Sequence, residues 1–159
     1  MTTLHLMVGL PGVGKTTLAL QLARELPALR LSADDLQLAL FGDDMAHPDH
    51  NARHDAIEAA LWPIAVQALQ AGADVILDFG FWSRTERDDL RARAAALGHA
   101  SRLHLPDDPG PAERLARIRR RPHGFAVTAA DLAGYVVLYQ PPDPVEMTGV
   151  ADMPPPVAP

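Results

Sequence analysis

The sequence has no cysteine and a single lysine among its 159 residues. The absence of cysteine excludes a disulfide framework and a thiolate metal site. No apolar run comes near the roughly eighteen residues that a transmembrane helix needs, so we expect no membrane contact. The N-terminus has neither a basic leader nor a cleavage signature, and we therefore expect a cytoplasmic protein.

The remaining composition is that of a globular protein with an acidic balance. Apolar residues make up 48% of the chain, and the formal net charge is −6. This charge argues against a general nucleic-acid coat, which needs an excess of cations. The length predicts one domain, residues 1–150, and the proline-rich residues 151–159 are expected to form a mobile tail.

The only lysine falls in residues 9–16, Gly-Leu-Pro-Gly-Val-Gly-Lys-Thr, which fit the phosphate-binding loop pattern G-x-x-x-x-G-K-[ST], the Walker A motif. A short apolar run over residues 4–8 predicts a buried strand before the loop, and helical spacing over 17–26 predicts a helix after it. The motif therefore has the strand, loop and helix context that it requires.

Glycines in this loop let successive backbone N–H groups point inward, and the following helix adds its positive end. Such a nest binds nucleotide phosphates, with Lys15 at the β- and γ-phosphates and the Thr16 hydroxyl on Mg²⁺. We therefore predict that the protein uses ATP and Mg²⁺. The predicted nucleotide-binding residues of the loop are Gly9, Pro11, Gly12, Val13, Gly14, Lys15, Thr16 and Thr17.

A pair of aspartates follows a short strand predicted at residues 29–31. Ser32 and Asp35 have the spacing of a capping box, in which the Asp35 side chain reaches back to the start of the helix. Asp34 is then the free carboxylate at the carboxyl edge of the sheet, where ligands of α/β folds bind. We predict Asp34 as the general base for an acceptor hydroxyl, although both acids are also typical of a helix start.

Asp78 ends a further predicted strand, residues 73–78. A carboxylate at the end of a buried strand beside a phosphate loop usually supports the magnesium shell, so we predict Thr16 and Asp78 as the metal residues. His50 and His54 are four residues apart and invite a separate metal site. No third ligand is indicated, however, and magnesium on the nucleotide is the expected metal.

Five arginines lie in the helix predicted between Pro111 and Pro122. Cations near a helix C-terminus complement its dipole, but five in an acidic protein exceed that need. A mobile lid at this place would bring arginines onto a transferring phosphoryl group. We predict Arg117 and Arg121 as catalytic and Arg120 as nucleotide-binding, although the spacing does not decide which of them reaches the phosphates.

Strands alternate with helical patterns throughout the chain, which predicts an α/β fold of three layers with a parallel sheet of four or five strands. Ser83 and Thr128 begin capping boxes that predict two later helices. Trp82 is interpreted either as core filler or as a wall of the acceptor pocket. Arg84 and Arg87 at a helix start indicate an anionic neighbour, which nearby acids could also supply.

The order of these features resembles the small P-loop kinases grouped with the zeta-toxin, chloramphenicol phosphotransferase and polynucleotide 5′-kinase families. Over roughly residues 3–146 the chain most resembles the bacterial ATP-binding AAA_33 family, through GLPGVGKTTLA, LSADDL, VILDFGFWSRTERDDLR, RLARIRRR and YQPPDPVE. The resemblance implies that Lys15 and Thr16 bind nucleotide and magnesium and that Asp34 activates the acceptor. Polynucleotide kinases have an arginine three residues after this aspartate, where this chain has Gln37.

We therefore expect an ATP-dependent phosphotransferase that moves the γ-phosphoryl group of Mg-ATP to a hydroxyl of a small molecule. The guanine signature Asn-Lys-x-Asp is absent, which argues against a GTP-dependent switch. A nucleotide-binding regulatory protein without turnover and a polynucleotide 5′-hydroxyl kinase are the alternatives, and Gln37 weakens the second. The sequence predicts no particular oligomeric state.

Overall fold

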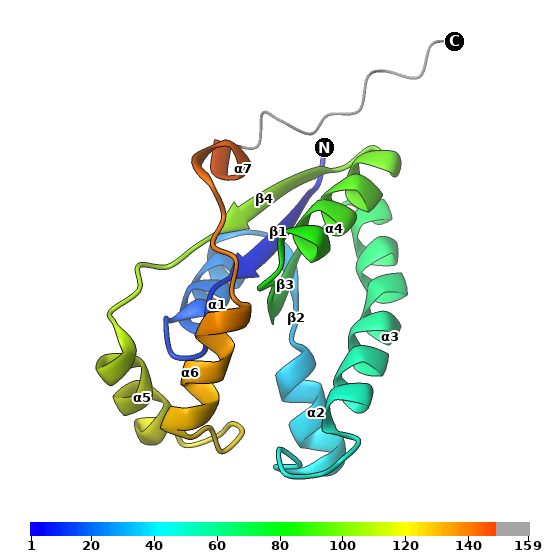
Figure 1. Ribbon diagram of the computed structural model, residues 1–159. Helices are drawn as coiled ribbons and strands as arrows, with labels where there is room; N and C mark the ends of the chain where they lie inside the picture. Colours follow the sequence, from blue (N-terminus) through cyan, green and yellow to red (C-terminus); the bar gives the residue numbers. More distant parts are fainter. Residues whose placement is uncertain (149–159) are drawn as a thin grey trace.

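Four parallel strands form the central sheet of the computed structural model, which describes residues 1–148 (Figure 1). Their order across the sheet is β2-β3-β1-β4. The strands are β1 (Thr3–Val8), β2 (Ala28–Leu31), β3 (Asp74–Gly80) and β4 (Ala100–His104). The arrangement confirms the predicted α/β class with four strands, whereas the tail predicted at 151–159 lies outside the described residues.

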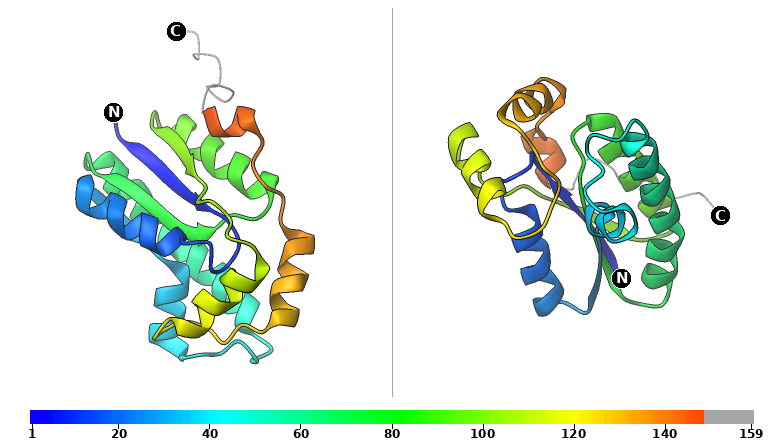
Figure 2. Two further views of the ribbon diagram at one scale, coloured as in Figure 1. Left: turned by 90° about the vertical axis from the view of Figure 1, so that its left-hand side faces the viewer. Right: turned by 90° about the horizontal axis from the view of Figure 1, so that it is seen from below.

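Helices cover both faces of the sheet and complete the predicted three layers. Helix α1 (Lys15–Glu25) lies on one face, and α3 (His50–Gln70) and α4 (Arg84–Ala96) lie on the other (Figure 2). Alternation along β1 explains this division, because Leu6 packs in the core against α3 and α4 whereas Met7 packs against α1.

Four further helices belong to the described residues. They are α2 (Ala33–Phe41), α5 (Pro111–Arg120), α6 (Ala129–Leu138) and α7 (Pro144–Thr148). Helices α5 and α6 stand beyond the carboxyl ends of the strands and contact each other (Figure 1). No helix within residues 1–148 combines the length and the apolar character needed to span a membrane.

The order of the strands creates a place for a ligand. Strands β1 and β3 are hydrogen-bonded neighbours, but the helices that follow them, α1 and α4, lie on opposite faces. A reversal of this kind opens a crevice at the carboxyl ends of the strands, where ligands of α/β sheets bind. Both the predicted phosphate loop and Asp78 lie at this edge.

The predicted caps begin α4 and α6. Ser83 forms a capping box with Glu86, and Thr128 forms one with Asp131. In each box the hydroxyl accepts a first-turn N–H and the acid accepts the N–H of the cap residue, which satisfies two amides that the helix leaves unpaired. Helix α3 continues through Pro63, so the restart that a proline allows does not occur.

The capping box predicted at α2 is only half formed. The Ser32 hydroxyl accepts the Asp35 N–H at 3.2 Å, as predicted. The Asp35 carboxylate, however, does not return to the cap and instead accepts a hydrogen bond from Arg30 Nη1 at 2.8 Å. An arginine on the neighbouring strand end therefore replaces the cap N–H as the partner of this acid.

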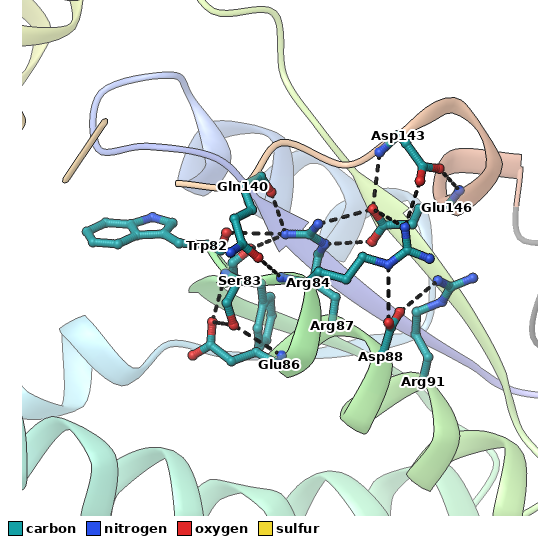
Figure 3. A network of polar contacts seen from close by, with 11 residues as sticks. Trp82, Ser83, Arg84, Glu86, Arg87, Asp88, Arg91, Gln140, Asp143 and Glu146 are labelled. Atoms are coloured by element: carbon teal, nitrogen blue, oxygen red, sulfur yellow. Dashed lines mark hydrogen bonds and ion pairs between the residues drawn. The ribbon is translucent and has the colours of Figure 1, made fainter. Parts of the chain in front are cut away.

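A buried ion pair joins α4 to α7, and sequence reasoning did not predict either the pair or this last helix. The side chains of Arg87 and Glu146 are 0% and 1% exposed, and two parallel hydrogen bonds of 2.9 and 3.1 Å connect them (Figure 3). Arg87 Nη1 also donates to the Gln140 carbonyl at 2.8 Å. Arg84 donates to Asp143 at 2.6 Å. The anionic neighbours of these arginines therefore come from the C-terminal segment and, for Arg84, also from the nearby Asp88, whose carboxylate accepts a hydrogen bond from Arg84 Nε at 3.2 Å.

Candidate phosphate-binding site

The loop between β1 and α1 has the curled backbone that its glycines predict. Gly9, Gly12 and Gly14 have positive φ angles of 139°, 84° and 106°. The Gly9 N–H donates to the Gly80 carbonyl at 3.0 Å, which ties the loop to the end of β3. A Cβ atom at Gly12 would lie 2.6 Å from the Arg114 carbonyl oxygen, so α5 approaches the loop this closely only because residue 12 is glycine.

The first turn of α1 offers backbone N–H groups to a ligand. The helix begins at Lys15, and its N-cap residue Gly14 provides no side-chain hydrogen bond to these amides. Thr16 and Thr17 are exposed beside them. Unpaired amides at a helix N-terminus attract anions, so the segment fits a phosphate group. The eight predicted nucleotide-binding residues are divided between the loop before α1 and this first turn.

Lys15 folds back over the loop and lies near two carboxylates. Its Nζ donates to the Leu10 carbonyl at 2.9 Å. Burial lowers the pKa of the Lys15 ammonium group to about 8, and the charges of Asp78 and Asp34 oppose this decrease. The structure therefore brings the predicted phosphate-binding lysine, the predicted base and the predicted metal residue within electrostatic reach of one another.

The Asp78 carboxylate is paired with an arginine that sequence reasoning missed. Arg30 donates to Asp78 Oδ2 from Nε at 3.1 Å and from Nη2 at 2.7 Å, and its third nitrogen bonds Asp35. The Asp78 side chain is only 2% exposed. The position of Arg30 near the carboxyl end of β2 was a signal for this contact, because parallel strands bring these ends to one edge.

The oxygen atoms of Thr16 and Asp78 suit a magnesium ion. Mg²⁺ prefers hydroxyl and carboxylate oxygens and keeps several water ligands beside one or two protein groups. No group of three or more histidine, aspartate or glutamate side chains within residues 1–148 is arranged to hold a metal by itself. His50 and His54 contact Asp44 and Gln37 respectively, at 2.8 and 2.9 Å.

The arginines of α5 take separate positions around the loop. Arg117 Nη1 donates to the Val13 carbonyl of the phosphate loop at 3.4 Å. Arg114 is buried and pairs with an aspartate of the preceding connection. Arg120 is 66% exposed and pairs with Glu113 at 2.9 Å, so the structure does not bring it to the loop. Of these three, Arg117 is the arginine that lies on the predicted nucleotide site.

Arg121 ends α5 and begins the connection to α6. Its charge acts on both Lys15 and Asp34. With the residues that follow, it lines a cavity of about 330 Å³. The Ala126 N–H donates to Asp43 at 2.9 Å and ties this connection to the end of α2, which the view from below shows (Figure 2). The cavity therefore borders the site and does not contain the phosphate loop.

Asp34 occupies the start of α2, and 56% of its side chain is exposed. Enough protein surrounds it that desolvation raises the pKa of its carboxyl group, and the positive charges of His54 and Lys15 oppose this increase. The Tyr135 phenol of α6 shares this region, since burial and then the charges of Asp131 and Asp34 raise its pKa. The predicted base is therefore accessible on α2 and lies within electrostatic reach of α6.

Trp82 supports the phosphate loop from the neighbouring strand. Phe81 has a positive φ of 43°, rare for a bulky residue, and turns the chain directly after β3. Trp82 Nε1 then donates to the Gly9 carbonyl at 3.1 Å, and its ring lies 4.8 Å from that of Tyr135. The role in the acceptor wall stays a prediction, but the contact with the loop is a role that neither interpretation of the sequence included.

The sheet, the curled glycine loop and the lysine at the start of α1 define an α/β protein of the P-loop NTPase type. The sequence matches the AAA_33 family, described as an AAA domain, over residues 4–142, and the chain belongs to this family. The match confirms the resemblance drawn from the motifs. No curated protein matches the sequence.

Solved structures share the fold. A chain of the Pnkp1/Rnl/Hen1 RNA repair complex superposes with a TM-score of 0.70 at 23% identity, over 86% of this chain and 43% of that one. Kti12 from Chaetomium thermophilum, in complex with ADP-AlF3, superposes with a TM-score of 0.67 at 23% identity, over 89% of this chain and 82% of that one. A sugar kinase from Janibacter sp. HTCC2649 superposes with a TM-score of 0.65 at 21% identity, over 92% of this chain and 82% of that one. This chain therefore spans less than half of the RNA repair chain.

Proposed function

We propose that the protein is an ATP-dependent phosphotransferase that moves the γ-phosphoryl group of Mg-ATP to a hydroxyl of a small molecule. The observation that supports this most is that Lys15 lies at the phosphate loop within electrostatic reach of two carboxylates, those of Asp34 and Asp78. One cation for the phosphates and one accessible carboxylate for the acceptor are the groups that phosphoryl transfer requires.

The nucleotide would bind through the loop and the lysine. The first-turn amides and Lys15 would hold the β- and γ-phosphates. A phosphate oxygen would then replace the Leu10 carbonyl oxygen as the hydrogen-bond acceptor of Lys15 Nζ. Thr16 and Asp78 would hold the magnesium ion, which supplies positive charge that neutralises the phosphate oxygens. Arg30 holds the Asp78 carboxylate in its orientation at this position through two hydrogen bonds.

The acceptor hydroxyl would bind beside Asp34, which acts as the base. Its carboxylate takes the proton of the acceptor hydroxyl as the acceptor oxygen forms a bond to the γ-phosphorus and the bond from that phosphorus to ADP breaks. Arg117, which already lies on the loop, and Arg121 would offset the charge on the transferring group. The proposed chemistry is therefore positioning and electrostatics, with one proton transfer.

Two alternatives have specific support. The likeness to a chain of an RNA repair complex favours a polynucleotide 5′-hydroxyl kinase. Against it, position 37 holds a buried glutamine in place of the arginine of the polynucleotide kinases, and the protein has a net charge of −6. A nucleotide-binding regulator without turnover is the second alternative, and it differs from the kinase in whether Asp34 matters.

The test compares Asp34→Asn with Asp35→Asn, two neighbouring carboxylates of which only the first faces Lys15 in the proposed site. Each variant and the wild type are incubated with γ-labelled ATP, magnesium and pooled nucleosides, sugars, antibiotics and oligonucleotides. We expect Asp34→Asn to lower the transfer rate at least about a hundredfold while nucleotide affinity is retained, and Asp35→Asn to keep most of the activity.

Different results would favour the alternatives. Nucleotide binding without a labelled product from any acceptor would favour the regulator. Label on oligonucleotides alone, with binding that weakens steeply as salt rises, would favour the polynucleotide kinase. Equal loss of transfer in the two variants would show that Asp34 has no special part in the reaction.

A further inference from the structure

Gln37 lies one turn after Asp34, and the orientation of its amide is determined by its neighbours. The side chain is fully buried. Its Nε2 lies 3.0 Å from Asp44 Oδ1 and 3.0 Å from the His50 carbonyl oxygen, which are both acceptors. The amide nitrogen must therefore face these two oxygens, and the amide oxygen must face the other way.

The amide oxygen of Gln37 determines the protonation of His54. His54 Nδ1 lies 2.9 Å from Gln37 Oε1, so this ring nitrogen must hold a hydrogen to make the bond. On the other side of the ring, Nε2 lies 3.2 Å from Glu58 Oε1. A lone pair facing a carboxylate would be repelled, whereas an N–H would be attracted. Both ring nitrogens are therefore protonated, and His54 is an imidazolium ion.

This imidazolium lies beside the predicted base. His54 Nδ1 is 3.8 Å from Asp34 Oδ1, an ion-pair distance, and the His54 side chain is 23% exposed. The partners come from two helices, since Asp34 and Gln37 belong to α2 whereas His54 and Glu58 belong to α3. The cation is therefore fixed relative to Asp34 by the packing of α2 against α3.

We propose that His54 is a positioning residue, an imidazolium held between Gln37 and Glu58 that keeps the Asp34 carboxylate ionised and directed toward the phosphate loop. This proposal rests on the proposed function for the role of Asp34 as a base. It assigns a role to the buried glutamine: Gln37 accepts a hydrogen bond from the cation, which an arginine at this position would instead repel.

The charges around the pair support this assignment. Contact with Glu58 raises the pKa of His54 despite burial, and Asp34 and Asp55 act in the same direction. Burial raises the pKa of Asp34, and His54 and Lys15 oppose it. The groups that face Asp34 besides His54 are Lys15, Asp78, Arg121 and Tyr135. Loss of the imidazolium therefore moves the titration of Asp34 to higher pH.

The far side of Gln37 is equally constrained. Burial would raise the pKa of Asp44, but hydrogen bonds from Arg53, His50 and Gln37 hold it far below its usual value. Asp44 therefore remains a carboxylate, which only accepts hydrogen bonds, throughout the pH range in which His54 titrates. The amide cannot turn over in that range without placing its oxygen against this carboxylate.

The test is an NMR titration of the full-length protein without substrate. Nitrogen-15 spectra, assigned with His54→Asn, are expected to show protons on both His54 ring nitrogens near pH 7 and a titration midpoint above the ordinary 6.5. Glu58→Gln, which replaces the carboxylate by an uncharged amide of the same size at a half-buried position, is expected to lower that midpoint. A neutral His54 with one ring proton near pH 7 would overturn the proposal.

A second NMR titration measures the effect of His54 on the pKa of the Asp34 carboxyl group. Carbon-13 signals of the Asp34 carboxyl group are expected to titrate at higher pH in His54→Asn than in the wild type. His47→Asn, at an exposed position in the connection between α2 and α3, is expected to cause no change. An unchanged Asp34 titration in His54→Asn would overturn the positioning role. Because no substrate is present, absent phosphoryl transfer would count against the proposed function and not against this coupling.

Activity supplies a further readout once an acceptor is known. His54→Asn is expected to lower kcat at least about tenfold at neutral pH, to leave the affinity for ATP unchanged and to shift the acid limb of the rate profile to higher pH. A uniform decrease at every pH, with the acid limb in place, would contradict the proposal.

Discussion

Gly12 is the residue at which the phosphate loop meets α5. Its φ of 84° lies in the left-handed region, and an added Cβ atom would lie 2.6 Å from the backbone oxygen of Arg114. Backbone atoms of a helix cannot move aside as a flexible side chain can. The glycine therefore serves both the curl of the loop and the approach of the arginine helix.

Gly12→Ala is expected to destabilise the protein by about 3 kcal/mol and to weaken nucleotide binding, because strain and the clash with α5 add. The matched control is Gly98→Ala, which has a similar φ of 81° but nothing within 4 Å of the new atom. This control is expected to cost about 1 kcal/mol. Urea unfolding measures both, and equal costs would contradict the close contact between the loop and α5.

At the residue scale, local patterns predicted what depends on neighbours in the chain. The loop motif located Lys15 and Thr16, because its spacing directly forms the nest of amides. The contact of His54 with Gln37 was not predictable, because it depends on how α3 packs against α2. Arg30 was missed although its place near the end of β2 was a signal, because the partner that this edge brings to it, Asp78, lies 48 residues away in the chain.

At the element scale, α4 and α7 are held together by Arg87 and Glu146 (Figure 3). Arg87 also donates to backbone carbonyls on both sides of the contact, those of Phe81 and Gln140. It thereby joins the turn after β3, which leads to Trp82, to the segment after α6. The ion pair therefore supports the turn from which Trp82 reaches the phosphate loop.

Arg87→Met is expected to destabilise the protein by about 3–5 kcal/mol, because the buried Glu146 loses both parallel hydrogen bonds and is left with the longer ion-pair contact with Arg84 at 3.5 Å. Arg84→Ala is the comparison: it removes an arginine of the same turn whose pair with Asp143 is 44% and 47% exposed, and it is expected to cost less than about 1 kcal/mol. Both are measured by chemical unfolding. Similar costs for the two variants would contradict a structural role for the buried pair.

Element boundaries were predictable where a short signal sets them. Capping boxes at Ser83 and Thr128 determined where α4 and α6 begin, because the cap and its partner are three residues apart. Helix α7 was missed although it has such a signal: Asp143 and Glu146, three residues apart, exchange the two hydrogen bonds of a capping box, and Pro144 follows the cap. Glu146 also bonds an arginine 59 residues earlier, and no local pattern predicts that contact.

At the scale of the whole molecule, two histidines connect neighbouring strands of the sheet. His5 Nδ1 lies 2.9 Å from His104 Nε2 across β1 and β4. Burial, followed by the charge of His5, lowers the pKa of His104 to about 4. Burial also lowers the pKa of His5, although Asp74 opposes the effect. The folded protein therefore favours the neutral form of both rings.

Acid is accordingly expected to destabilise the fold before most carboxylates titrate. Between pH 6.5 and about 4 the unfolded chain binds a proton at His104 and the folded protein does not, so stability decreases as pH falls through this window. From pH 7 to 5 we expect a loss on the order of 1 kcal/mol from His104, allowing for the partial exposure of its ring.

Urea unfolding at both pH values measures this loss. His104→Gln is expected to flatten the dependence, and His123→Gln, at an exposed position, controls for the removal of a histidine. An equally steep dependence in His104→Gln would show that other groups account for it.

The fold class was predictable because alternating strands and helices leave few parallel topologies. The region proposed for the acceptor was not predictable, since the elements around it are connected by contacts between distant residues, such as the bond from Ala126 to Asp43. The spacing of residues along the chain does not indicate such contacts.

Calorimetry with Mg-ATP tests the central claim, that the loop of residues 9–16 binds the phosphates of a nucleotide. We expect one site per chain in the wild type and an affinity at least roughly tenfold lower in Lys15→Ala, which loses charge-assisted bonds to the phosphates. Arg24→Ala, which removes a cation from the other end of α1, is expected to bind like the wild type. No binding of ATP by the wild type, or equal binding by Lys15→Ala, would contradict the account.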